Sequence, residues 1–129
     1  MIDLHGGLVL LLLARAAAFE APASLFVCGL GYTGERIACE FKERFPECEV
    51  SGSTRSAERA AELRARRPWL NTSAVFDLDD EYRGLDAAGR EALARATHVV
   101  QTVAPIADGD ADPLLALHGA ALRASARLR

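Results

Sequence analysis

The sequence predicts an α/β fold, a doubly wound parallel sheet of about four strands in the order 3-2-1-4 with flanking helices. Three observations predict it. A short apolar run at 25–28 stops at glycines spaced Gly-x-Gly-x-x-Gly, segments of strand and helix periodicity then alternate, and a β-branched run follows at 97–103. Strands that alternate with helices pair in parallel, because each helix carries the chain back across the sheet. Residues 24–129 therefore form one domain, preceded by an extension at 1–23.

The junction after the first strand carries the most informative motif, Gly29-Leu30-Gly31-Tyr32-Thr33-Gly34. Gly29 allows a tight turn, Gly31 lets the backbone approach a diphosphate, and Gly34 lets the next helix pack closely on the strand. A diphosphate here lies over N–H groups at a helix N-terminus, where the helix dipole favours negative charge. The motif predicts dinucleotide binding, and the alternative is an unoccupied glycine-rich turn.

The carboxyl end of the second strand indicates which dinucleotide is bound. Proteins built for NAD usually carry Asp or Glu here to hold the ribose 2′-hydroxyl, but this chain has Ser53, Thr54 and Arg55. Glu49 lies at the start of the strand, away from the cofactor. An arginine can bind a 2′-phosphate bidentately and hydroxyls add donors, whereas a carboxylate repels it. The sequence favours NADP over NAD as the cofactor; the alternative for Arg55 is a solvated loop cation.

The remaining elements follow from periodicity and from residues that start or stop helices. Ile37, Phe41 and Phe45 recur every four positions, which predicts a helix with one apolar stripe. Ser56 is an N-cap candidate for the second helix, and Pro68 stops it. We expect strands at 25–28, 48–53, 73–78 and 97–103, and helices at 33–45, 56–67, 85–96 and 114–128. The basic cluster at the end of the second helix is interpreted as a solvated helix end: Arg64, Arg66 and Arg67.

Composition excludes several classes of function. The chain is 50% hydrophobic and 26% charged, as is ordinary for a globular domain, and its net charge of −3 gives no basic surface for nucleic acid. Its three cysteines contain no Cys-x-x-Cys pair, which argues against a disulfide framework and a zinc site. The acidic run at 77–81 lies before a helix with no histidine nearby, so no metal is expected, and His98 is interpreted as structural.

The extension at 1–23 differs in kind from the rest. Its apolar block, Leu8 to Leu13, is too short to span a bilayer. The block is similar to the hydrophobic region of a secretory leader, and residues 16–22 are similar to the cleavage signature of leaders that target algal secondary plastids. Asp3 and the absence of Lys or Arg before the block argue against a leader. The alternatives are a plastid or secretory leader and a loosely helical extension of a cytoplasmic protein.

The chain resembles the atypical, extended branch of the short-chain dehydrogenase/reductases, which are grouped with NAD-dependent epimerases and dehydratases. The resemblance covers about residues 24–128 and rests on the glycine motif and on five further segments: Gly52 to Ser56, Phe76 to Asp80, Ala96 to Val100, Val103 to Pro105, and the 108–112 loop with His118 beyond it. It implies a Rossmann fold in which the glycine loop binds the diphosphate and Arg55 binds the adenosine end. It also implies that Asp77 and Leu78 lie against the adenine, and that Val103, Ala104 and Pro105 line the nicotinamide-side ribose.

The same resemblance implies a chain about twice as long, with a catalytic Tyr-x-x-x-Lys after a fifth strand. Here Tyr32 is followed four residues later by Arg36 and Tyr82 by Asp86, and Lys42 faces outward from the first helix. No catalytic residues are therefore assigned. We expect the cofactor-binding half of an oxidoreductase or epimerase acting on an unknown small carbonyl or sugar-like substrate, with the chain alone inactive.

Two alternatives keep the expected fold. The chain could be a non-catalytic NADP-binding sensor or interaction module, or the cofactor domain of a 6-phosphogluconate-type dehydrogenase, which also begins Gly-Leu-Gly. The expected sheet leaves the fourth strand at an edge with unpaired backbone groups. That edge predicts association with a second copy or with a complementary chain.

Overall fold

The computed structural model describes residues 23–78, 84–104 and 112–129, which form a five-stranded mixed sheet and four helices. The α/β class is therefore confirmed, while most of the extension, residues 1–22, lies outside the described residues. The strands are β1 (Ser24–Cys28), β2 (Glu49–Thr54), β3 (Thr72–Asp77), β4 (Gly84–Leu85) and β5 (His98–Gln101). The helices are α2 (Tyr32–Arg44), α3 (Ala57–Arg66), α4 (Ala87–Arg95) and α5 (Pro113–Ala124). In this part of the chain, no helix has the length and apolar character needed to cross a bilayer.

The sheet has the strand order β4-β3-β2-β1-β5. The β1–β2, β1–β5 and β2–β3 pairs are parallel, whereas β3 and β4 are antiparallel, with Phe76 opposite Leu85. The expected sheet of four strands, all parallel, is therefore wrong. Leu85 was expected to begin a helix, but Gly84 adopts a φ of +68° and Leu85 pairs with β3 before the helix begins.

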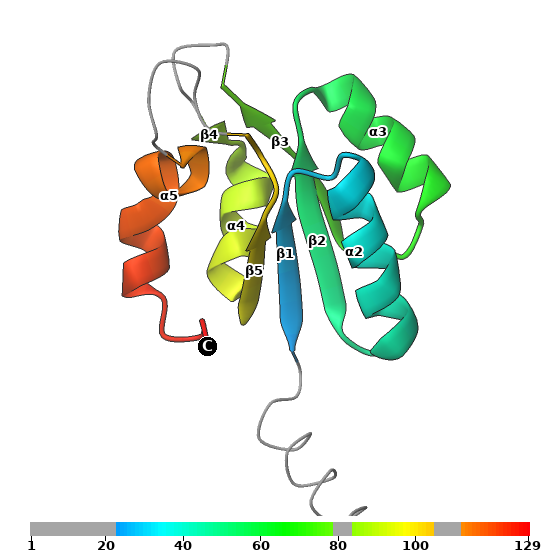
Figure 1. The fold of residues 1–129 in the computed structure, drawn as a ribbon, viewed down its shortest axis with the longest axis horizontal. Coiled ribbons are helices and arrows are strands. Elements are labelled where there is room, and N and C mark those ends of the chain that lie inside the picture. The colour runs from blue at the N-terminus through cyan, green and yellow to red at the C-terminus, as the bar shows by residue number, and fades with distance from the viewer. Residues whose placement is uncertain (1–22, 79–83, 105–111) are drawn as a thin grey trace, which may run out of the picture.

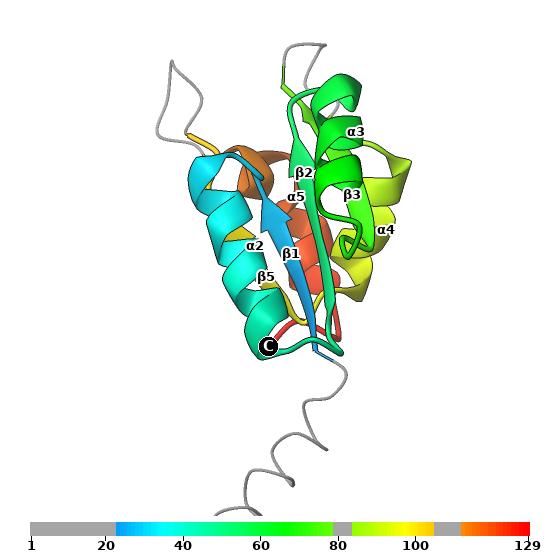
Figure 2. The same ribbon diagram turned by 90° about the vertical axis from the view of Figure 1, so that its right-hand side faces the viewer.

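The helices lie on both faces of the sheet (Figures 1 and 2), with α2 and α3 on one face and α4 and α5 on the other. Side chains of β1 alternate between the two cores. Leu25 and Val27 pack in the core with Leu63 of α3, whereas Phe26 and Cys28 pack in the core with Leu93 of α4. All five residues of β1 are buried, as expected for a central strand covered on both faces.

Three helices begin with a side chain that accepts a hydrogen bond from the first turn, which stabilises a helix N-terminus. Ser56 Oγ accepts from Arg59 N–H at 3.1 Å, so the expected N-cap is confirmed. Asp86 caps α4 and Asp112 caps α5, through bonds of 2.8 and 2.9 Å. The N-cap of α2 is Gly31, which has no side chain for this purpose. Helix α5 ends at Ala124, earlier than expected.

A buried histidine joins α5 to the edge of the sheet. His118 is 9% exposed, and its Nε2 accepts a hydrogen bond from Leu85 N–H at 3.0 Å. Its ring lies 5.9 Å from that of Phe76, and a Cβ on Gly84 would come within 2.5 Å of Nε2. Burial lowers the pKa of His118, and the positive charge of Arg90 lowers it further. The neutral ring is therefore the form that the fold stabilises, because only a neutral Nε2 can accept a bond.

We predict that His118 makes the free energy of unfolding depend on pH. Because the unfolded chain binds the proton more readily, the stabilisation is complete above the ordinary pKa of about 6.5 and is lost as the pH falls below it. Urea unfolding of the parent and of His118→Gln between pH 8 and pH 5 gives the free energy of unfolding at each pH, and the slopes of the two proteins against pH are compared. The amide oxygen introduced can accept the Leu85 N–H without titrating, so the parent should lose more stability, by at most about 1.4 kcal/mol per pH unit. Equal slopes would contradict the prediction.

Candidate functional site

A cleft of about 750 Å³ lies at the carboxyl ends of the parallel strands, a size that suits a small-molecule ligand. It brings together most residues that the sequence predicts for a dinucleotide. Predicted residues that line it are Gly29, Leu30, Gly31, Tyr32, Thr33, Gly34, Ser53, Thr54, Arg55, Leu78, Val103 and Ala104. Asp77 ends β3 without lining the described part of the cleft, and Pro105 lies outside the described residues.

The three glycines of the loop meet three different steric conditions. Gly29 has a φ of +102°, and a Cβ there would come within 2.5 Å of Thr102 Oγ1. A Cβ on Gly34 would lie 1.9 Å from the carbonyl oxygen of Gly29, so no side chain fits between α2 and the loop. A Cβ on Gly31 would meet no atom within 4 Å. The fold therefore needs Gly29 and Gly34, whereas the space beside Gly31 is open.

The N-terminus of α2 borders the cleft with its backbone donors uncapped. The first bond of the helix runs from Glu35 N–H to Gly31 O, at 2.8 Å, so the N–H groups of Tyr32, Thr33 and Gly34 precede the helical ladder. Gly31 adds no side-chain cap, unlike Ser56 on α3. Uncapped donors and the positive end of the helix dipole together favour an anion at this position.

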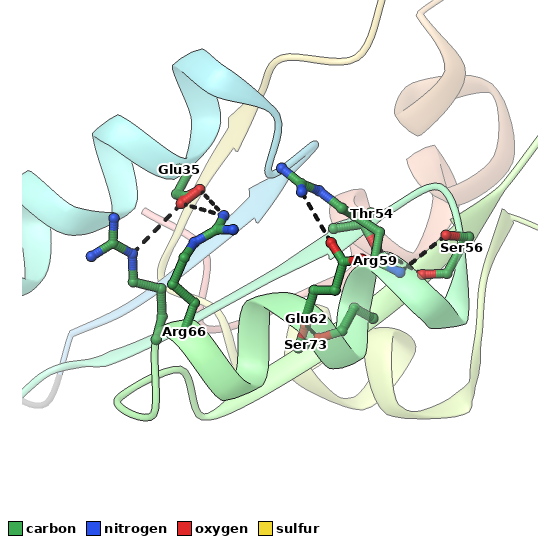
Figure 3. A network of polar contacts seen from close by, with 9 residues as sticks. Glu35, Thr54, Ser56, Arg59, Glu62, Arg66 and Ser73 are labelled. Carbon is green, nitrogen blue, oxygen red and sulfur yellow. Dashed lines mark hydrogen bonds and ion pairs between the residues drawn. The ribbon is translucent and has the colours of Figure 1, made fainter.

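A carboxylate in the first turn of α2 is turned away from this position and neutralised. Glu35 faces Arg66 of α3 in Figure 3, and their side chains form a two-bond ion pair at 2.6 and 2.9 Å. Arg67 Nε lies 3.5 Å from the same carboxylate. Arg66 and Arg67 stand at the end of α3 and stay partly exposed, as expected, but they also join α3 to α2, which the interpretation as a solvated helix end did not include. The ion pairs also reduce the repulsion that Glu35 would exert on a bound diphosphate.

The hydroxyls at the end of β2 are bonded within the protein: that of Ser53 supports the glycine loop, and that of Thr54 holds the turn before α3. Ser53 is fully buried, and its Oγ accepts a bond from Gly29 N–H at 3.3 Å, while its carbonyl accepts from Leu30 N–H at 2.7 Å. Thr54 Oγ1 donates to the carbonyl of Ser56 at 3.0 Å. Arg55, by contrast, is exposed at the cleft. Of the three residues predicted at the end of β2, Arg55, which directly follows the strand, has the polar group most accessible to a ligand.

Three further residues line the cleft that sequence reasoning missed: Arg59, Phe76 and Thr102. Arg59 lies four positions after Arg55 and forms an ion pair with Glu62 at 3.3 Å (Figure 3). The signal available was position: Arg59 lies in the first turn of α3, directly after the β2 end where Arg55 stands. Among the described residues that line the cleft, these arginines are the charged ones, so the site favours an anion at its β2 end.

The remaining nucleophilic or basic candidates are engaged elsewhere. Cys28 is fully buried in β1, and burial raises the pKa of its thiol to about 11, so it stays protonated at neutral pH. Cys48 is also buried, as expected of core residues. Lys42, the chain's single lysine, donates to the carbonyl of Cys48 at 2.9 Å near the far end of α2. Within the described residues, no group of three or more His, Cys, Asp or Glu side chains is placed to hold a metal ion.

The cleft thus combines uncapped helix donors at its centre with two arginines at its β2 end and apolar side chains beside β3 and β5. Such an arrangement can hold an elongated anionic ligand that has apolar parts. A scan against protein-family models, a search of curated proteins and a search of solved structures each found no match for the chain.

Proposed function

We propose that the chain binds a nicotinamide dinucleotide in this cleft, with NADP preferred over NAD. The observation that carries the proposal is the uncapped N-terminus of α2 beside Gly31, where a ligand can approach the backbone without meeting a side chain. We also propose that the fold is of the Rossmann type. The parallel strands follow the order β3-β2-β1-β5, helices cover both faces, and the short antiparallel β4 is added at one edge.

The proposed pose follows from the order of the strands. The diphosphate lies over the central loop after β1, at the N–H groups of Tyr32 to Gly34. The adenosine half lies toward β2 and β3, where Phe76 and Leu78 offer apolar contact and Arg55 a cation. The nicotinamide half lies toward β5, beside Val103 and Ala104. Ligands in open α/β sheets bind outside the carboxyl ends of the strands in this way.

The preference for NADP rests on Arg55 and is tested by its removal. Calorimetric titration of the parent should show tighter binding of NADPH than of NADH, because the two cofactors differ in the 2′-phosphate. Arg55→Ala should weaken NADPH binding about tenfold, the size expected for losing one charge-assisted hydrogen bond, and leave NADH within about twofold.

Arg64→Ala is a matched control, because Arg64 is another exposed arginine of the same region that does not line the cleft. It should leave both affinities unchanged. A variant of Arg55 that weakens NADPH and NADH equally would contradict the assignment to the 2′-phosphate. Absence of binding of either cofactor to the parent would overturn the proposed function.

The wider role proposed is that of the cofactor-binding part of an oxidoreductase or epimerase of the short-chain dehydrogenase/reductase type. A second candidate, dinucleotide binding without turnover, is favoured by the position of Lys42. This lysine lies ten residues after the start of α2, about 15 Å along the helix, and its amine is bonded to Cys48 O. It therefore cannot lower the pKa of a tyrosine at the cleft. Hydride transfer by this chain to any of a panel of carbonyl compounds would exclude the second candidate. Absence of turnover is expected of both, because the cofactor-binding part alone is also expected to be inactive.

A further inference from the structure

The last residue of β5 joins a segment that lines the cleft to the N-terminus of α5. Gln101 Oε1 accepts a hydrogen bond from Val103 N–H, and its Nε2 donates to the Val103 carbonyl at 3.0 Å. The same Nε2 donates to Asp112 Oδ2 at 2.8 Å. One amide side chain thus satisfies both backbone groups of Val103 and reaches the N-cap of α5. Gln101 itself does not line the cleft, whereas Val103 does.

The adjacent residue fixes the same segment to the glycine loop. Thr102 N–H donates to the carbonyl of Cys28 at 2.9 Å, and Thr102 Oγ1 donates to the carbonyl of Gly29. Thr102 therefore joins the end of β5 to the end of β1, and Gln101 joins the next residue to α5. Asp112 serves two partners, since its Oδ1 accepts from Leu115 N–H at 2.9 Å while Oδ2 accepts from Gln101.

We propose that Gln101 is a positioning residue that sets the β5 wall of the cleft for the nicotinamide half of the dinucleotide. It acts through Val103, because the side-chain amide holds both backbone groups of that residue. This inference rests on the proposed function and adds to it a residue outside the cleft that distinguishes the two halves of the ligand. The adenosine half lies toward β2 and β3, away from this amide.

Two ligands separate the two halves: NADPH, and adenosine 2′,5′-bisphosphate, which lacks the nicotinamide half. Gln101→Glu keeps an acceptor for Val103 N–H but places a carboxylate against Asp112 and against the Val103 carbonyl. We expect this variant to bind NADPH about tenfold more weakly and the bisphosphate within about twofold of the parent. Gln101→Met, of similar length and without charge, should also weaken NADPH binding, by a smaller factor, and should again leave the affinity for the bisphosphate within about twofold of the parent.

The double variant Gln101→Glu/Asp112→Asn reverses the polarity of the pair, because the new amide can donate to the new carboxylate. It should recover part of the lost NADPH affinity, because the new carboxylate still faces the Val103 carbonyl. A merely structural role would not separate the two ligands. Far-UV circular dichroism and the melting temperature identify any variant that fails to fold. If Gln101→Glu does not fold, the two affinities of Gln101→Met test the inference in its place.

Three outcomes overturn the inference. The first is an equal loss of affinity for both ligands, and the second is no loss for either. The third is that the parent binds neither ligand, which overturns the proposed function together with the inference. A parent that binds both ligands while the variants change neither affinity leaves the proposed function standing and removes Gln101 from it.

Discussion

Gly34→Ala should destabilise the protein by about 3 kcal/mol, lowering its melting temperature by roughly 10–20 °C. The added Cβ would lie 1.9 Å from the carbonyl oxygen of Gly29 and 3.1 Å from a methyl group of Val27. Neither neighbour can yield easily. The carbonyl belongs to a loop fixed by Thr102 and Ser53, and Val27 is fully buried in the central strand. Helix α2 would have to move away from the sheet and lose apolar contacts with β1.

Gly119→Ala is the matched control, because Gly119 is also a buried glycine within a helix. A Cβ there would meet only the Arg123 guanidinium, at 3.3 Å, which a flexible side chain can move away. Alanine is the better helix former, so this variant should be neutral or stabilise the fold by up to about 1 kcal/mol. Urea unfolding of both variants gives the comparison. Equal stabilities would show that α2 does not pack on the loop as closely as the structure has it.

The strands that the sequence predicts well are those whose signal is local. β1 is a continuous apolar run because both of its faces are covered, and that pattern needs no knowledge of the rest of the fold. β4 has no such signal. It has two residues, and it is a strand only because of distant partners. Leu85 pairs with Phe76, and its N–H donates a hydrogen bond to His118, which lies 33 residues away along the chain. In the sequence, Leu85 stands just before α4 and looks the same as the first core-facing residue of that helix.

The candidate site also has parts with a local sequence signal and parts that depend on contacts between distant residues. The glycine spacing predicts the loop, and two of its positions meet the steric expectation: Gly29 has a positive φ, and Gly34 has no room for a side chain beside Gly29, whereas Gly31 faces open space. The pairing of Glu35 with Arg66 could not be predicted, because it joins two helices 31 residues apart. Ser53 was predicted as a ligand donor, yet its hydroxyl is fully buried beneath the loop. A residue type shows that a donor is present, but only the packing shows where that donor points.

Gly31→Val should abolish dinucleotide binding, weakening NADPH affinity by at least about 100-fold, while the fold is kept. The N-cap backbone has φ −80° and ψ −159°, a conformation that any residue adopts, and a Cβ meets no atom within 4 Å. Valine is a poor N-cap, so the free energy of unfolding should fall by about 1 kcal/mol or less. Its methyl groups would occupy the space that the proposed diphosphate needs, and the loss of several backbone bonds to an anion accounts for the expected 100-fold.

Gly31→Ser makes the test sharper, because its effects on stability and binding should have opposite signs. The hydroxyl can cap α2 as Ser56 caps α3, which should raise stability by a few tenths of a kcal/mol. A cap of this kind uses a backbone N–H that the proposed diphosphate needs, so NADPH should bind more weakly than to the parent. If both Gly31 variants folded and bound NADPH as the parent does, the uncapped N-terminus of α2 would not be the diphosphate site.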